Sequence, residues 1–216
     1  MKVLKSLFLC SFSVILALFT ISCSETEADV VSTSVSTVFD FADKESNPSV
    51  RLAIFLQVTN EVQRTESFTV SHEESGYSWT VAKPGIFSGL NKNYAYSANL
   101  KAPEGAEIPT GLYSVTYTDA AGNQDEIKFS VNYKKELLAS NSETFREFLP
   151  NSNENIALYD DSGELLYMGK AKKTWTSNAA ILKDYKLADT KRICYVSGGN
   201  SVVCMMPEEK LKTEEN

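Results

Sequence analysis

Cysteine and histidine are the side chains of this sequence best suited to covalent or metal-binding chemistry. The 216 residues contain four cysteines, and His72 is the single histidine. The segment around His72 does not match the metal-binding pattern H-E-x-x-H, and the sequence has no G-x-S-x-G nucleophile pattern. A lone imidazole in a polar segment is typically solvated. We therefore expect no catalytic residue, no metal site and no cofactor, which leaves Cys10, Cys23, Cys194 and Cys204 as the residues with chemistry to explain.

The beginning of the chain has the pattern of an export signal. Lys2 and Lys5 precede the apolar stretch 7–19, which is shorter than the about 20 residues that cross a bilayer. The sequence Thr20-Ile21-Ser22-Cys23 then resembles the lipobox of bacterial lipoproteins. In that family the signal is cut before the cysteine, whose thiol receives a diacyl group built from fatty acids such as palmitate.

The lipobox resemblance implies a location and an anchor. Residues 1–22 would be a signal peptide, and acyl chains on Cys23 would hold the protein in a membrane of the bacterial cell envelope, at the periplasmic face or the cell surface. An ordinary secretory signal and a retained membrane helix are the alternatives.

Charge narrows the range of partners. The chain carries a formal charge of −7, and removal of residues 1–22 takes away two lysines and no acid, which leaves −9. This balance argues against a nucleic-acid partner, which needs a basic surface. Residues 23–34 are rich in Ser, Thr and Glu, so we expect a lipidated cysteine followed by a flexible acidic tether.

Alternating apolar residues predict a mainly β body. Residues 50–58 alternate on both faces, which predicts a central strand that is covered on both sides. Shorter strands are expected at 68–70, 77–81 and 94–100. The segments 113–117 and 127–133 form the clearest hairpin, around the turn Asp119-Ala120-Ala121-Gly122-Asn123.

The start of this hairpin resembles the tyrosine corner of immunoglobulin-like sandwiches. There, a tyrosine lies two residues before a core position, and its hydroxyl bonds back to upstream backbone. Tyr113 and Val115 would fill these two places, after Pro109-Thr110-Gly111. The resemblance implies an immunoglobulin-like antiparallel β-sandwich over residues 35–134.

Residues 135–206 are expected to contain one short helix and a C-terminal β-hairpin region, followed by a frayed tail at 207–216. The helix is predicted at 142–149, with Ser142 as its cap and Pro150 as its end. A hairpin is predicted around Asp161-Ser162-Gly163, with Gly163 in the left-handed region. Its pairing would place Leu158 opposite Leu166, and Ile156 opposite Met168.

Cys194 and Cys204 are the thiols left for the exported body, and export permits a disulfide. If the loop is Gly198–Asn200, with Asn200 in the left-handed region, the two cysteines face each other across a hairpin. A two-residue Gly-Gly turn would instead pair Cys194 with Val203 and turn the thiols to opposite faces. We expect the disulfide, and two free buried thiols are the alternative.

These patterns together predict a lipid-anchored envelope protein with a non-catalytic binding or structural role. Loops or a sheet edge would contact an unknown protein or glycan partner. The alternative is a small envelope enzyme or enzyme accessory factor that uses His72 or the acid-rich loops.

Overall fold

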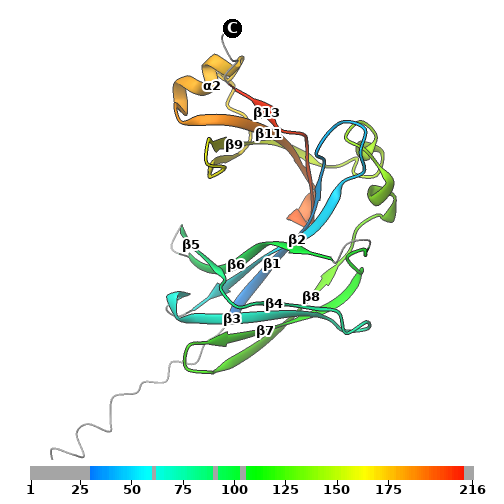
Figure 1. Ribbon diagram of the computed structural model, residues 1–216, viewed down its shortest axis with the longest axis vertical. Coiled ribbons are helices and arrows are strands. Elements are labelled where there is room, and N and C mark those ends of the chain that lie inside the picture. The colour runs from blue at the N-terminus through cyan, green and yellow to red at the C-terminus, as the bar shows by residue number, and fades with distance from the viewer. Residues whose placement is uncertain (1–29, 60–61, 90–91, 103–105, 212–216) are drawn as a thin grey trace, which may run out of the picture.

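The computed structural model describes residues 30–59, 62–89, 92–102 and 106–211, and Figure 1 shows their arrangement. The predicted signal peptide, Cys23 and residues 24–29 of the predicted tether lie outside the described residues. Within the described part the protein is mainly β, as the sequence predicted, and it contains two sheets and one short α-helix. No helix in this part of the chain is long and apolar enough to cross a membrane.

The larger sheet has the strand order β10-β9-β11-β12-β1-β2-β6-β5, and β13 pairs with β11 outside this order. Its strands are β1 (Val30–Asp40), β2 (Ser49–Val58), β5 (Gly85–Gly89), β6 (Lys92–Lys101), β9 (Asn153–Asp160), β10 (Leu165–Gly169), β11 (Ala188–Val196), β12 (Val202–Met205) and β13 (Glu209–Lys210). The smaller sheet has the order β4-β3-β7-β8. Its strands are β3 (Thr65–His72), β4 (Ser78–Val81), β7 (Gly111–Asp119) and β8 (Gln124–Val131).

The smaller sheet packs against β1, β2 and β6 and forms a sandwich lobe over residues 30–131. Leu52, Ile54 and Leu56 alternate along β2 and enter one core together with Phe68 and Val115. Strand β2 pairs with β1 on one side and with β6 on the other. Its opposite face is also covered in the middle, because Ala53 packs in a second cluster. The prediction of a doubly covered central strand is confirmed.

The predicted hairpin is present as strands β7 and β8, joined at the predicted turn. Tyr113 lies opposite Phe129, and Val115 lies opposite Ile127. The Tyr113 hydroxyl donates a hydrogen bond of 2.6 Å to the carbonyl oxygen of Pro109, which is the geometry of a tyrosine corner. In the turn, Gly122 has a φ of 86°, which a glycine adopts without strain. The alternation of apolar residues and the turn sequence therefore predicted this hairpin correctly.

Residues 153–211 form a C-terminal lobe that continues the larger sheet. Strand β12 pairs in parallel with the second half of β1, from Thr37 opposite Val202 to Asp40 opposite Met205. The α-helix of this lobe is α2 (Asn178–Asp184), whose N-cap residue Ser177 accepts a hydrogen bond from the amide of Ala180. Figure 1 shows β1 and β2 running from one lobe into the other.

The helix predicted at 142–149 is wrong. The segment holds only the 3-10 helix η3 (Phe145–Glu147), preceded by η2 (Lys135–Ala139). The side chain of Asn141 accepts hydrogen bonds from the amides of Glu143 and Thr144, both at 3.0 Å, and this turn replaces helical bonding. So short a segment gains too few helical hydrogen bonds to offset nucleation.

The structure shifts two predicted boundaries. Residues 30–34, which we expected in the tether, form the start of β1, because β-branched Val and Thr pair well beside β2. In the expected tail, β13 pairs with β11, and Leu211 is buried beside Ile181. Residues 212–216 of the tail lie outside the described residues.

The second predicted hairpin, β9 and β10, is present with a different register. Gly163 has a φ of 82°, as expected from the loop sequence. A bulge follows Leu165, so Tyr167 lies opposite Leu158, and Met168 lies opposite Ala157. The predicted pairing of Leu158 with Leu166 and of Ile156 with Met168 is therefore wrong by one residue.

Candidate functional site

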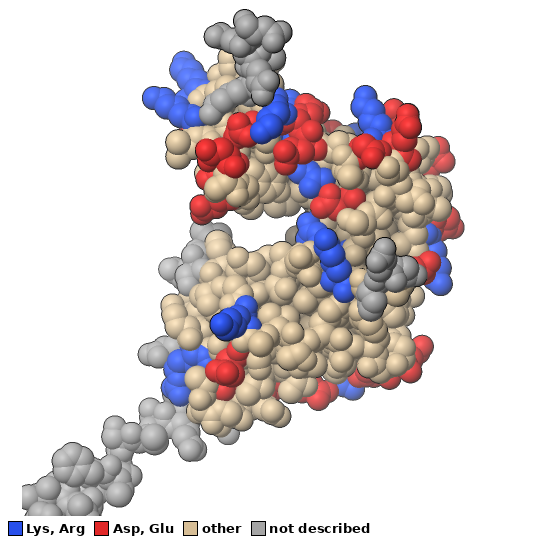
Figure 2. All heavy atoms as spheres, viewed as in Figure 1, with Lys and Arg blue, Asp and Glu red and all other residues tan. Residues whose placement is uncertain are grey.

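The two lobes turn the same face of the larger sheet toward an open hollow. Figure 2 shows this hollow as a notch between the lobes. The opposite face of the sheet fills the sandwich core in one lobe and the cluster under α2 in the other. The hollow is therefore lined by side chains on the sheet face that points away from these two cores.

Aromatic side chains form the wall on the sandwich lobe. Phe55 stacks on Tyr96 at 5.1 Å between ring centroids and meets Tyr94 edge-on at 6.4 Å. Phe87 lies 6.3 Å from Tyr94 and is 53% exposed. We call these four residues of β2, β5 and β6 the aromatic platform. They adjoin because strand pairing places Phe55 opposite Tyr96, and Tyr94 opposite Phe87.

Gly85 allows the platform to lie flat on the sheet. A Cβ atom at this position would come within 2.6 Å of the Tyr96 ring, far closer than atoms pack. The missing side chain lets the ring of Tyr96 rest on the backbone of β5. This contact fixes Tyr96 and, through stacking, Phe55.

The facing wall on the C-terminal lobe is also apolar. Met168 and Leu165 of β10 are each 49% exposed, and they share their face of the sheet with Tyr159 and Ala157 of β9. Burial raises the pKa of the Tyr159 hydroxyl, which therefore stays protonated and able to donate a hydrogen bond at neutral pH. Exposed apolar side chains on two facing walls are typical of a binding surface.

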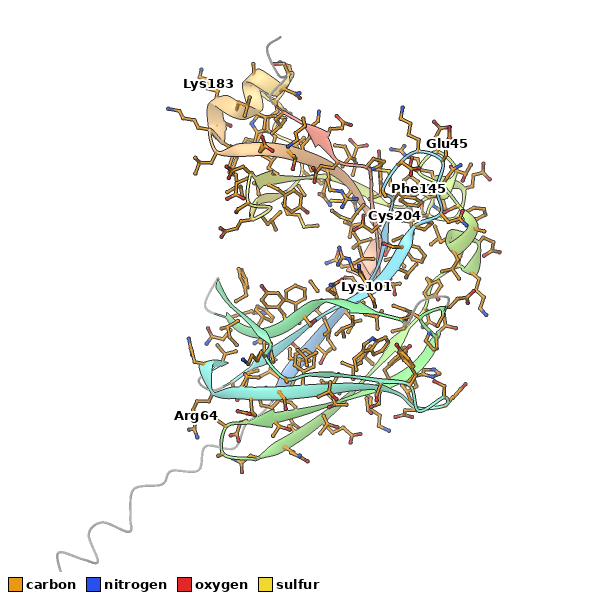
Figure 3. The ribbon with its side chains drawn as sticks, in the orientation of Figure 1. Glu45, Arg64, Lys101, Phe145, Lys183 and Cys204 are labelled. Carbon is orange, nitrogen blue, oxygen red and sulfur yellow. The ribbon has the colours of Figure 1, made fainter. Side chains whose placement is uncertain are left out.

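Charged side chains form the floor of the hollow. The carboxylate oxygens of Asp40 lie 2.6 Å from a guanidinium nitrogen of Arg192 and 3.6 Å from one of Arg51. Asp40 therefore links β1 to β2 and β11. Arg192 also donates to the carbonyl oxygen of Met206 at 2.7 Å, and Arg51 donates to that of Ala98. Figure 3 shows Lys101 at the inner end of the hollow, opposite Arg51 in the strand register. These side chains, which we call the charged floor, carry three positive charges against one negative charge.

His72 does not contribute to the hollow and is not solvated as expected. It is only 4% exposed, and its ring centroid lies 4.8 Å from that of Tyr113. Its Nδ1 accepts a hydrogen bond from the amide of Ser75 at 3.2 Å, and its Nε2 lies 3.2 Å from the carbonyl oxygen of Thr110. The network assigns the proton to Nε2. With both nitrogens engaged by the loops beside it, His72 supports the tyrosine corner.

Cys194 and Cys204 do not form the predicted disulfide. Both are free and buried. The four-residue loop 198–201 pairs Cys194 with Met205, and Tyr195 with Cys204, so the thiols point to opposite faces of the sheet. Asn200 does adopt the expected left-handed conformation, with a φ of 60°. The loop is one residue longer than the predicted loop, which moves the register by one and separates the thiols.

The thiols pack as apolar groups in different clusters. Cys194 lies with Ala157 and Val38 beneath the hollow, whereas Cys204 lies with Phe39 and Phe145 at the junction of the lobes. Figure 3 shows Cys204 and Phe145 close together there. Burial raises the pKa of Cys194 to about 11 and that of Cys204 to about 12, so both are protonated and unreactive at neutral pH.

A small pocket lies beside η3. Its volume is about 140 Å³, and Leu149, Pro150, Ser152 and Glu154 contribute to its lining. The guanidinium of Arg146 lies 4.2 Å from the centre of the Tyr195 ring and 3.3 Å from the Glu154 carboxylate. The charge of Arg146 is therefore paired within the protein. Elsewhere in the described ranges no group of three or more His, Cys, Asp and Glu side chains is arranged to hold a metal ion.

Comparison of the chain with protein-family models, with curated proteins and with solved structures gave no match. The class of the protein is therefore defined by its own fold and surface: a two-sheet β protein with an aromatic hollow between two lobes. Sequence reasoning did not identify this hollow. The alternation of Tyr94 and Tyr96 around Ala95 was a possible signal, but the register that joins these rings to Phe55 and Phe87 comes from the structure.

Proposed function

We propose that the protein is a lipid-anchored bacterial envelope protein with a non-catalytic binding role, and that its immunoglobulin-like sandwich presents the hollow to a partner. The lipobox-like sequence before Cys23 supports the anchor. The binding role is supported by the aromatic platform, whose Phe87 is exposed, and by the exposed Met168 and Leu165 across the hollow. Acyl chains on Cys23 contact the membrane, and the partner contacts the body.

The partner that best fits this surface is an extended segment of another protein that carries an acidic side chain. The aromatic platform and the opposite wall offer apolar contacts, and the charged floor offers more positive than negative charge. Strands β5 and β10 are the two ends of the larger sheet, and both border the hollow. Among the residues that the structure describes, no strand pairs with the outer edge of either one, and an extended peptide could pair there by strand addition.

Crosslinking in the intact envelope tests the binding role. A photoreactive amino acid replaces Phe87 in the full chain, and the matched control replaces Leu112, which is 39% exposed on the other sheet. We expect crosslinked protein from position 87 only. A glycan partner would instead give adducts that glycosidases remove, and the absence of adducts from position 87 would contradict the proposed site.

Fatty-acid labelling tests the anchor. The wild-type protein should take up labelled palmitate and partition into detergent, because two or more acyl chains hold a protein stably in a membrane. Cys23→Ser should do neither, whereas Cys10→Ser should behave as the wild type, since Cys10 leaves with the signal peptide. Label that persists in Cys23→Ser would refute lipidation at this residue.

A further inference from the structure

A second group of aromatic residues lies on the C-terminal lobe, on the face of the sheet opposite the hollow. The rings of Tyr167, Trp175 and Tyr185 contact one another with centroid separations of 5.1, 5.5 and 5.8 Å. Two pairs are nearly perpendicular, at 77° and 83°. The rings rest on the buried core under α2, which includes Leu158 and Ile181. The three rings therefore form a supported, angled cluster.

This cluster already holds an ammonium group. The Nζ atom of Lys172 lies 5.1 Å from the centre of the Trp175 ring and 5.5 Å from that of Tyr185. It also contacts Asp184 at 2.9 Å, and the same carboxylate oxygen accepts a hydrogen bond of 2.8 Å from Trp175 Nε1. Aromatic faces with a nearby carboxylate are the arrangement that proteins use to bind quaternary ammonium ions.

Asp184 keeps its charge independently of Lys172. The pKa of Asp184 is lowered first by the hydrogen bond from Trp175 and then by the one from Lys172. If Lys172 moves away, the indole N–H still orients the carboxylate and favours its ionised form. The cluster would then keep a negative charge beside the partly buried rings.

Lys172 is an occupant that can be displaced. Its side chain is 46% exposed, and that of Asp184 is 36% exposed. Ion pairs at such exposure are weak, because water screens them and the long lysine side chain loses freedom when it is held. A quaternary ammonium ion loses less hydration than a primary one, so it gains more from contact with aromatic rings.

We propose that Tyr167, Trp175, Tyr185 and Asp184 form a binding site for a quaternary or fully methylated ammonium group, and that Lys172 occupies this site in the ligand-free protein. The site is separate from the hollow and does not depend on the function proposed for it. Figure 3 shows α2, with Lys183 labelled, at the outer end of the C-terminal lobe, and the side chains of Lys172 and Asp184 are partly exposed to solvent.

Titration of the full chain with tetramethylammonium chloride tests this proposal. The sequence has two tryptophans, so the indole N–H signals in an NMR spectrum report on Trp175 and, as an internal reference, on Trp79 in the sandwich lobe. We expect the Trp175 signal to move and the Trp79 signal to stay. Sodium chloride at equal concentration is the control for ionic strength.

Removal of Lys172 should strengthen binding. In Lys172→Ala the dissociation constant for tetramethylammonium should fall about fivefold, because only the molecules whose site is free of Lys172 bind the ligand and an exposed ion pair of this kind is weak. Lys173→Ala removes a neighbouring exposed lysine and should bind as the wild type does. Lys172→Met keeps the apolar stem of the side chain and serves if the alanine variant folds poorly.

A double variant and two further ligands test which groups the site recognises. Tyr185→Leu, combined with Lys172→Ala, should abolish binding, and choline and phosphocholine show whether a phosphate beside the ammonium group changes affinity. The proposal is overturned if tetramethylammonium leaves the Trp175 signal of Lys172→Ala unmoved, or if sodium moves it equally. Equal affinity of wild type and Lys172→Ala would show that Lys172 does not occupy the site.

Discussion

The sandwich lobe and the C-terminal lobe share one sheet but are stabilised differently. The sandwich lobe encloses a single large apolar cluster between its two sheets. The C-terminal lobe has smaller clusters and more ion pairs, among them Lys172 with Asp184, Lys191 with Glu209, and Arg192 with Asp40. In Figure 2 charged side chains crowd the C-terminal lobe, whereas the visible face of the sandwich lobe is largely uncharged.

This difference explains why strand register was predictable in one lobe and not in the other. Along β7, buried residues alternate strictly with less buried ones, so a slip of one residue would expose the core. Along β12 all four residues are buried, because both faces of that strand are covered. A slip there exchanges one apolar side chain for another, and the sequence pattern does not penalise it.

The largest effect should come from a charge in the sandwich core. Val115 is fully buried, so Val115→Asp places an unpaired carboxylate between the sheets and should cost several kcal/mol of a typical total of about 5–15 kcal/mol. Leu112→Asp, on the exposed face of the same strand, should change the free energy of unfolding by less than about 0.5 kcal/mol. Urea denaturation of both variants gives the comparison. Equal stabilities would mean that β7 does not face a core.

A smaller loss should follow from breaking the contact between the lobes. Asp40→Asn leaves Arg51 and Arg192 without their carboxylate and should cost about 1–3 kcal/mol, since the side chain of Arg192 is 15% exposed. Trp175 fluorescence should report unfolding of the C-terminal lobe earlier than Trp79 reports that of the sandwich lobe.

The exposed ion pair of Arg146 with Glu154 is the control for this second prediction. Both side chains are about 60% exposed, so Glu154→Gln should change stability by less than about 1 kcal/mol. If both tryptophans report the same transition in Asp40→Asn, the two lobes unfold as one unit and the contrast between them concerns packing alone.

A modest gain is expected at Thr33, where β1 faces the sandwich core. Its Oγ1 is buried, and no partner for it is found in the described part of the chain. Thr33→Val removes this unsatisfied oxygen and should raise the free energy of unfolding by about 1 kcal/mol. Thr65→Val should have the opposite effect, because Thr65 Oγ1 donates to the carbonyl oxygen of Val62 at 2.7 Å. Loss of stability in Thr33→Val would place its hydroxyl in contact with a partner.

The smallest effect is expected from reduction of the protein. Peptide mapping after alkylation should give the same masses for the Cys194 and Cys204 peptides with and without prior reductant, because neither thiol is bridged. In the native state both should alkylate slowly at pH 8. If the two peptides become alkylated only after reduction, the protein contains the disulfide that the sequence predicted.

The thiols also predict a dependence of stability on pH. Their folded-state pKa values, about 11 and about 12, lie above the value of about 8.5 for a free cysteine. Below about pH 8.5 the thiols are protonated in both the folded and the unfolded state. Above it the unfolded chain loses these protons first, so the free energy of unfolding falls as the pH rises toward 11 and 12. Cys204→Ala should reduce this decline, which thermal melts at pH 8 and pH 10.5 would measure.

The sequence by itself determined the mainly β body, the central strand β2, the hairpin of β7 and β8 with its tyrosine corner, and the glycines of both hairpin turns. Each rests on interactions between residues close in the chain or on a strict alternation of apolar side chains. Such signals identify a strand or a turn without information about distant parts of the chain. Tyr113 and Val115 are the clearest examples.

Only the tertiary structure decided what lies around β1. The parallel pairing of β1 with β12 joins residues 37–40 to residues 202–205, and no local signal specifies a partner so distant in the chain. This pairing joins the two lobes, brings Arg192 of β11 near Asp40 of β1 and turns both lobes toward the hollow. The physical reason is that strand partners and covered faces are chosen by the whole sheet, whereas the sequence pattern of a strand covered on both sides is nearly the same in every register.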